Sequence, residues 1–236
     1  YLDQYTYNQG NPFLTPQYTN NFELNYMYKK KYSVGLGYSL TNDVITEVLL
    51  PDTNRKALFQ TNENLNRQIN YSLSANAPVS FARWWNSSNN LVVFYLGFRS
   101  ENLRGKELNT GRVAYQFNSQ HTFVVNKGMS AELSGDYQAP LEYGALRIQS
   151  QYGIDLGLSQ SFMNKKASVK LAVSDVFNTR KQRISSVYEG LTYNLEQKHE
   201  TRVARVTFSY RFGKNEVKPA RRRSTGLEEE QRRMKN

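Results

Sequence analysis

Apolar and polar residues alternate with a period of two along most of this 236-residue chain. The clearest run is VTFSYRFGK, residues 206–214, where Val206, Phe208, Tyr210 and Phe212 alternate with polar residues. Successive side chains of a β-strand point to opposite faces, so this pattern predicts strands with one apolar face. Such a strand suits a soluble sheet, and it equally suits a wall with lipid on one side and water on the other.

Nine segments carry this signal or a continuous apolar run of strand length. They lie at residues 22–28, 33–40, 68–75, 91–98, 113–125, 131–137, 147–159, 169–173 and 206–212. The segment LVVFYLGF, residues 91–98, is apolar throughout and is assigned to a strand by its length and its β-rich composition. We therefore expect an all-β fold built on one antiparallel sheet.

Short and long connections alternate along the chain. Short turns fall near residues 29–31, 81–86, 126–128 and 164–166, and long polar connections fall near 42–62, 99–112, 138–145 and 178–200. Outer-membrane barrels show this order because short turns face the periplasm and long loops face outside. Residues 146–162 also form a run much longer than the usual strand of about five or six residues. Both features favour a transmembrane β-barrel over a soluble sheet.

The predicted barrel is incomplete. Nine is an odd number, whereas bacterial single-chain barrels have even strand numbers, and an open barrel would expose unpaired backbone to lipid. The chain also begins YLDQYTYNQG, without Met or a signal peptide. We expect a C-terminal partial barrel, divided into an extracellular loop over 1–18, barrel strands over 19–213 and a basic, charged periplasmic tail over 214–236.

The composition gives no support to several other classes of protein. The net charge is +11, but the basic residues are scattered rather than gathered on one face with aromatic residues, so we expect no nucleic-acid partner. The chain has no Cys, which excludes disulfides and thiolate metal sites. His121 and His199 are the only histidines, and no spacing indicates a Ser-His-Asp set, a phosphate loop or a calcium loop. We expect no enzyme activity, no cofactor and no metal.

Three segments resemble TonB-dependent outer-membrane receptors. Residues 10–26, GNPFLTPQYTNNFELNY, match a recurrent loop and strand of these receptors, with Gln17 where a Glu is usual. Residues 169–179, VKLAVSDVFNT, resemble the penultimate strand with its D-[IVL]-F-N motif, and residues 202–213 resemble the closing strand. The Trp84-Trp85 turn and the Arg-rich tail resemble more specifically the related outer-membrane protein β-barrel family. The resemblance covers essentially the whole chain.

The resemblance implies active uptake of a scarce ligand across the outer membrane. The energy would come from the TonB system through a plug domain that lies upstream of this chain. Partners would be outer-membrane lipid, the barrel-assembly machinery and a small ligand whose identity the sequence does not give. Phe208, Tyr210 and Phe212 are similar to the strand signal that the assembly machinery reads, although 24 residues follow Phe212 here.

The polar faces of two predicted strands supply candidates for a ligand path in the lumen. These are Arg147, Gln149, Gln151, Asp155, Arg205 and Arg211, with the connections 42–62 and 99–112 as candidate ligand contacts. The same residues would also serve as hydrated lumen packing without any ligand role. Two other functions stay open: a structural or adhesive barrel without transport, and a soluble β-sheet binding domain.

Overall fold

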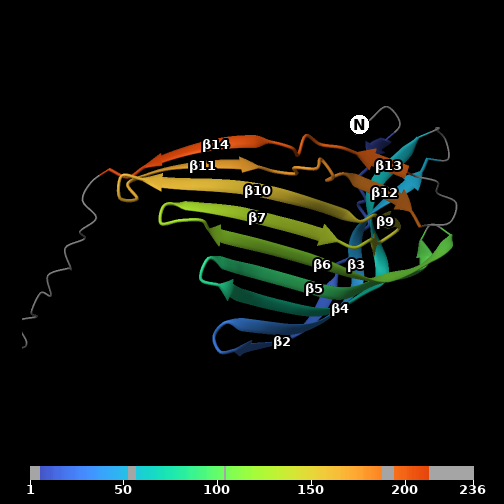
Figure 1. Ribbon diagram of the computed structural model, residues 1–236. Coiled ribbons are helices and arrows are strands. Elements are labelled where there is room, and N and C mark those ends of the chain that lie inside the picture. Colours follow the sequence, from blue (N-terminus) through green and yellow to red (C-terminus); the bar gives the residue numbers. More distant parts are fainter. Residues whose placement is uncertain (1–5, 53–56, 104, 188–193, 213–236) are drawn as a thin grey trace, which may run out of the picture.

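A computed structural model describes residues 6–52, 57–103, 105–187 and 194–212 (Figure 1). Nine strands form one continuous antiparallel wall in the order β14, β11, β10, β7, β6, β5, β4, β3, β2. Their bounds are β2 Tyr18–Tyr28, β3 Tyr32–Pro51, β4 Leu58–Ala82, β5 Trp85–Leu103, β6 Lys106–Val124, β7 Met129–Gln138, β10 Gln151–Phe162, β11 Ala167–Val173 and β14 Ala204–Tyr210. β1, Thr6–Asn8, pairs in parallel with β4. The expected all-β antiparallel wall is confirmed.

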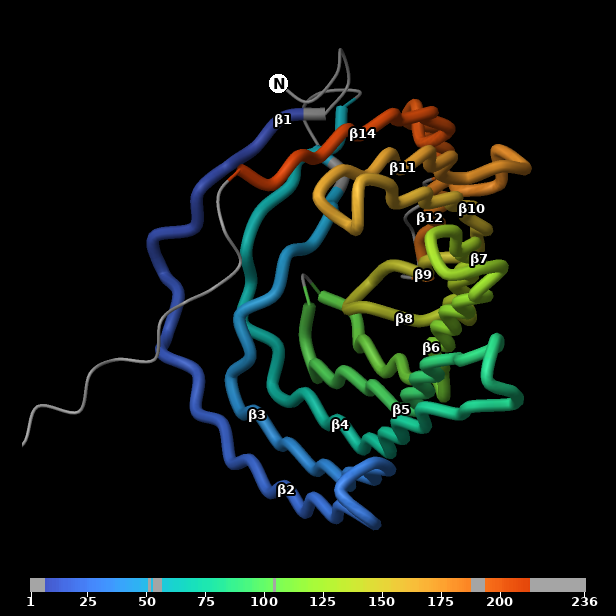
Figure 2. Tube along the Cα trace, turned by 60° about the vertical axis from the view of Figure 1, so that its left-hand side comes forward, coloured from blue at the N-terminus to red at the C-terminus, as the bar shows by residue number. Residues whose placement is uncertain are grey.

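We call the end of the wall with the short turns at 29–31, 81–86, 126–128 and 164–166 the turn end, and the opposite end the loop end. A smaller second sheet lies at the loop end (Figure 1). It has four strands in the order β13, β12, β9, β8, with bounds Asn194–Gln197, Gln182–Ser186, Leu146–Ile148 and Leu141–Tyr143. β8 contacts β5 and β6, and Leu141 is buried against Ala114 and Ala139. Figure 2 shows the wall curving round, with β8 and β9 on its inner side. The chain therefore fills part of the space that its own wall encloses.

The wall has one apolar and one polar face, as the alternation predicts. The strand register aligns apolar residues into rows that run across the strands on the convex face. One such row is Tyr26, Val34, Ala75, Leu91, Phe117, Tyr137 and Tyr152. Many large residues of this face are exposed, among them Leu24 at 67% and Tyr26 at 65%. An exposed apolar band of this extent marks a surface that faces lipid or another apolar partner.

Aromatic side chains border this band at both ends. Toward the loop end the rings of Phe22, Tyr38, Tyr71 and Tyr95 follow one another, with centroids 6.2, 5.2 and 6.3 Å apart. At the turn end Phe81 lies 4.3 Å from Trp85. Tyr71 and Phe81 are about ten residues apart on β4, which is the length a tilted strand needs to cross a bilayer. The two rows correspond to the aromatic girdles of membrane barrels.

The two connections predicted at 42–62 and 99–112 are not open loops, and this expectation was wrong. β3 and β4 stay paired as far as Pro51 and Leu58, and β5 and β6 stay paired as far as Leu103 and Lys106. β4 alone has 25 residues, more than twice the number that crosses a bilayer. These extended hairpins pack around a core that includes Val48, Leu65, Phe98, Leu108 and Ala145. The paired strands therefore continue beyond the part of the wall that crosses a bilayer, and there they need no apolar outer face.

Residues 146–162 do not form one strand, which corrects a second expectation. β9 belongs to the second sheet and β10 to the wall, and residues 149–150 separate them. The hairpin between β8 and β9 turns at Gly144, whose positive φ of 57° suits glycine. The predicted connections 138–145 and 178–200 hold β8 in the first case and β12 and β13 in the second. The tail 214–236 lies outside the described residues.

Candidate functional site

A tight turn follows β11 and positions the polar site. Its sequence is DVFN, and both Asp175 and Asn178 have left-handed backbone conformations, with φ of 46° and 57°. Asp and Asn adopt this region more readily than other residues with a Cβ, which explains their places in the motif. The amide of Asn178 donates to the carbonyl of Asp175 at 2.8 Å. Val176 anchors the turn to β10 by donating to the carbonyl of Ile154 at 2.9 Å.

The carboxylate of Asp175 is fully buried at the centre of the site. It accepts hydrogen bonds from the hydroxyl of Thr201 at 2.5 Å, from the amide of Thr179 at 2.7 Å and from the amide of Arg180 at 3.1 Å. Burial by itself would raise the pKa of Asp175, but these donors outweigh it and hold the pKa well below its usual range. Asp175 is therefore a charged anchor that joins the turn after β11 to the segment around Thr201.

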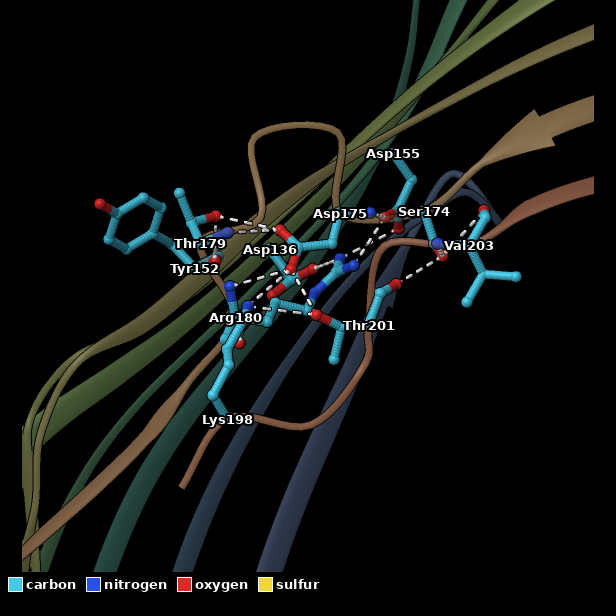
Figure 3. A network of polar contacts seen from close by, with 10 residues as sticks. All are labelled: Asp136, Tyr152, Asp155, Ser174, Asp175, Thr179, Arg180, Lys198, Thr201 and Val203. Atoms are coloured by element: carbon cyan, nitrogen blue, oxygen red, sulfur yellow. Dashed lines mark hydrogen bonds and ion pairs between the residues drawn. The ribbon is translucent and has the colours of Figure 1, made fainter. Parts of the chain in front are cut away.

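Arg180 joins this turn to the wall (Figure 3). Its guanidinium donates to both carboxylate oxygens of Asp155 on β10, at 2.6 and 3.0 Å, and it also pairs with Asp136 on β7. A Cβ on Gly153 would overlap the guanidinium, so glycine is needed at that position of β10. The hydrogen bonds from Arg180 to Asp155 and Asp136 raise the pKa of the guanidinium above its ordinary value.

Lys198 and Thr201 bring in the segment that leads to β14. The ammonium of Lys198 lies 3.4 Å from the carboxylate of Asp175 and donates to the carbonyl of Arg180 at 2.6 Å. The hydroxyl of Ser174 donates to the carbonyl of Thr201 at 2.8 Å. The site thus ties β7, β10, the turn after β11 and the approach to β14 into one network, which we call the lumen latch.

The lumen latch is held largely by ion pairs, and its charges do not balance completely. The carboxylates of Asp136, Asp155 and Asp175 face the cations of Arg180 and Lys198, so one negative charge is in excess. In the described part of the chain, no group of three or more His, Asp or Glu side chains could hold a metal ion. Because Arg180 lies just before β12 and Lys198 just after β13, the arrangement can hold these two strands of the second sheet, and a cationic or anionic ligand could exchange with its members.

Three of the six predicted lumen residues lie on the wall strands with the alternation that the sequence indicates. Asp155 is a member of the lumen latch, and Gln151 stands on the same face of β10 by the strand period. Arg205 pairs across from Ala172, which pairs with Gly157 of that same face. The structure therefore brings Asp155 into a network, while Gln151 and Arg205 share only its face.

The other three predicted lumen residues lie elsewhere. Arg147 is on β9 of the second sheet, where it donates to Glu142 at 2.6 and 3.1 Å. Gln149 lies between β9 and β10, and its amide donates to the carbonyl of Arg183 at 2.9 Å. Arg211 follows β14, and its amide donates to the carbonyl of Lys166 at 2.8 Å, next to a short turn. The expected single polar face from Arg147 to Asp155 was wrong because the strand is broken.

The predicted assembly-signal residues lie on or just beyond the last strand of the wall. Phe208 and Tyr210 are on β14, exposed to 64% and 42%, and Phe212 follows it with 90% exposed. The rings of Tyr210 and Phe212 meet edge to face at 4.6 Å. By the strand period Phe208 and Tyr210 face opposite to Arg205, on the apolar side.

His121 lies on the apolar face, near the turn end. The indole of Trp85 donates to Nδ1 of His121 at 3.1 Å, and Nε2 lies 3.0 Å from the hydroxyl of Ser119. Because Nδ1 accepts, a neutral His121 carries its proton on Nε2 and donates to Ser119. Ser119 in turn donates to Asn89 at 2.7 Å. This chain of hydrogen bonds holds His121 in a tautomer that cannot take the Ser119 proton.

The geometry of this wall agrees with a comparison to known families. The model of the outer membrane protein beta-barrel family matches residues 1–210. The chain belongs to this family. No curated protein and no solved structure matches the chain significantly. Family membership places the protein in the outer membrane, so the convex apolar band is the lipid-facing side of a barrel wall. No helix long and apolar enough to cross a membrane occurs in the described residues.

Four charged members of the lumen latch were not predicted as site residues: Asp136, Asp175, Arg180 and Lys198. Asp175 carried a usable signal, because it opens the DVFN motif that resembles the receptor family. Arg180 follows this motif by two residues. Asp136 and Lys198 carried no comparable local signal, since their partners are distant in sequence.

Proposed function

We propose that this chain is the C-terminal barrel segment of a TonB-dependent outer-membrane receptor that takes up a small ligand. The observation that carries the proposal is the second sheet on the inner side of the wall. A wall whose loop end is occupied by its own chain does not suit free diffusion. It suits a receptor that binds its ligand at the outer surface and opens its lumen only when transport occurs.

The fastening of this inner sheet supports the same proposal. The lumen latch is held by ion pairs and hydrogen bonds, and the side chain of Arg180 is still 25% exposed. Partly exposed ion pairs exchange with water at a modest cost in free energy. The latch can therefore hold the inner sheet at rest and release it when a ligand or an applied force competes for Arg180. Plug and TonB-contacting segment would belong to the intact protein upstream.

The proposed orientation follows from the family pattern of short and long connections. The short turns would face the periplasm, and the tail after Phe212 would lie there as well. Phe208, Tyr210 and Phe212 would be read by the barrel-assembly machinery. We propose no enzyme activity, cofactor or nucleic-acid partner.

A second candidate function is a structural or adhesive barrel. It is favoured by the long hairpins β3–β4 and β5–β6, which project beyond the membrane around a core of their own. It is also favoured by Phe13, whose side chain is 86% exposed beside a cleft of about 580 Å³ that Phe59 and Glu63 help to line. An adhesin uses such projecting surfaces and needs no opening of the lumen.

Growth under nutrient limitation distinguishes the two candidates. Cells that lack the gene would be compared with wild type on media in which iron chelates, glycans, peptides or vitamins are limiting. Uptake predicts a growth defect in one class, an equal defect on loss of TonB, and rescue by the intact gene. Normal growth on every class, together with independence from TonB, would favour the structural barrel.

A further inference from the structure

The turn end of the wall carries basic side chains at every short turn and at the end of the last strand. We call this edge the turn rim (Figure 1). Its cations are Lys29, Lys30, Lys31, Arg83, Lys127, Lys165, Lys166 and Arg211, and all of them are exposed. Neighbouring turns are separated by two strand spacings, or about 10 Å along the edge. The cations are therefore spread along the whole rim rather than gathered at one point.

The turn rim contains no acidic residue that could neutralise these charges. No Asp or Glu occurs at 27–33, 80–86, 124–130, 161–168 or 210–212. Among the described residues, none of the eight cations takes part in an ion pair. The opposite end differs, because there Arg147 pairs with Glu142 and Lys181 with Glu196. The positive potential of the turn rim is thus uncompensated by the described protein.

Exposed aromatic and apolar side chains lie at the same level as the cations. Trp84 is 53% exposed beside Arg83, and Met163 is 65% exposed near Lys165. The ammonium of Lys29 lies 5.1 Å from the ring centre of Tyr28, and that of Lys31 lies 5.2 Å from the ring centre of Tyr32. Tyrosine and tryptophan rings collect at the headgroup level of a bilayer. The cations therefore lie where lipid phosphates lie, rather than deep in the periplasm.

Three of the cations occupy backbone positions that do not favour lysine. Lys29, Lys30 and Lys165 have φ of 51°, 53° and 64°. Two consecutive residues with positive φ form the hairpin turn that Asn-Gly suits best, and side chains with a Cβ are disfavoured there. Backbone conformation therefore does not explain these lysines, whereas a role for their charge does.

We propose that the turn rim binds the anionic headgroups of phospholipids in the leaflet that it meets. Uncompensated cations at headgroup depth complement anionic lipid, and each basic residue near such a surface strengthens the association about five-fold. In the orientation proposed above, this is the periplasmic leaflet. The barrel would thus gather anionic lipid around its turn end and be held at a defined depth.

The two tryptophans of this chain, Trp84 and Trp85, provide a local probe of the lipid at the rim. The intact protein, with any tryptophan outside this chain changed to Phe, would be reconstituted in phosphatidylcholine vesicles. Brominated phosphatidylglycerol or brominated phosphatidylcholine would then be added in equal amounts as a fluorescence quencher. We expect phosphatidylglycerol to associate about five-fold more strongly at low salt, and the preference to shrink in 1 M salt because charges are then screened.

A pair of matched variants tests whether the rim causes the preference. The rim variant is Lys29→Asn, Lys30→Gly, Arg83→Gln and Lys127→Gln, and its first two changes relieve positive-φ backbone, so folding is retained. The control is Arg67→Gln, Arg99→Gln, Arg112→Gln and Arg202→Gln, which removes the same charge from exposed side chains toward the loop end. We expect the rim variant to lose the preference and the control to keep it.

Two results would overturn the inference. One is equal quenching by the two lipids in the wild-type protein. This result would overturn the inference even if a soluble acidic polymer bound the rim. The other is a preference that survives in the rim variant. Neither result bears on the uptake proposal, which the growth experiment tests separately.

Discussion

The guanidinium of Arg180 occupies the space that a Cβ on Gly153 would need, and it lies there between Asp155 and Asp136. The lack of a side chain at Gly153 therefore makes room for Arg180, which helps to hold the second sheet to the wall. The wall and the segment that folds inside it are therefore coupled at one contact.

Gly153→Ala should displace Arg180 and lower the free energy of unfolding by about 2 kcal/mol, the typical worth of hydrogen bonds between charged groups. Urea titration of the reconstituted protein measures this loss. In an Arg180→Ala background the same change should cost much less, because the overlapping group is gone. Gly135→Ala on β7 is the matched control, since its Cβ would meet only the carbonyl oxygen of Gly153, at 3.8 Å. Equal losses at both glycines would refute the coupling.

Asp175→Asn should destabilise the protein by about 2 to 4 kcal/mol, more than any exposed acid. Asparagine has an NH₂ group where aspartate has its second carboxylate oxygen. This group would face the N–H and O–H donors that now bind the carboxylate, so buried hydrogen bonds are lost. Glu196→Gln is the comparison, because Glu196 forms an exposed pair with Lys181 that contributes little to stability. The denaturant midpoints of both variants measure these losses of stability. A loss below 0.5 kcal/mol for Asp175→Asn would show that the buried carboxylate is not an anchor.

The lowered pKa of Asp175 predicts a specific acid sensitivity. The folded protein keeps this carboxylate charged at a pH where the unfolded chain, with a pKa of about 3.9, already binds a proton. Its stabilisation is complete above about pH 5 and is lost as the pH falls toward the lowered pKa. The difference in unfolding free energy between wild type and Asp175→Asn should therefore be constant from pH 7 to 5 and shrink below pH 4. A constant difference down to pH 3 would contradict this.

Phe208→Arg should reduce the stability of the inserted barrel by about 2 to 4 kcal/mol, because it places a charge on the lipid-facing side of β14. Ser209→Arg should have little effect, since Ser209 faces the polar side by the strand period. The fraction of protein with heat-dependent gel mobility reports folding in both cases. Equal loss for the two neighbours would argue against a lipid face on β14.

The wall was predictable from the sequence because a period of two is a direct consequence of strand geometry. This is why the faces of Asp155, Arg205 and Phe208 were assigned without the structure. The second sheet was not predictable, since a segment of three residues such as 146–148 is too short to show which sheet it joins. The lumen latch was missed for a related reason. Arg180 meets Asp155 across 25 residues and Asp136 across 44, and such pairings leave no local pattern.

The measurement that tests the central claim most directly is a spin-label scan of β14 in the reconstituted intact protein. The chain has no cysteine, so with any cysteine outside this chain changed to Ser, single cysteines from residue 204 to 210 can be labelled one at a time. A barrel wall predicts that positions 206, 208 and 210 are accessible to oxygen dissolved in lipid. Positions 205, 207 and 209 would instead be accessible to a water-soluble nickel complex. Equal access of the nickel complex to all positions would contradict a lipid-facing wall.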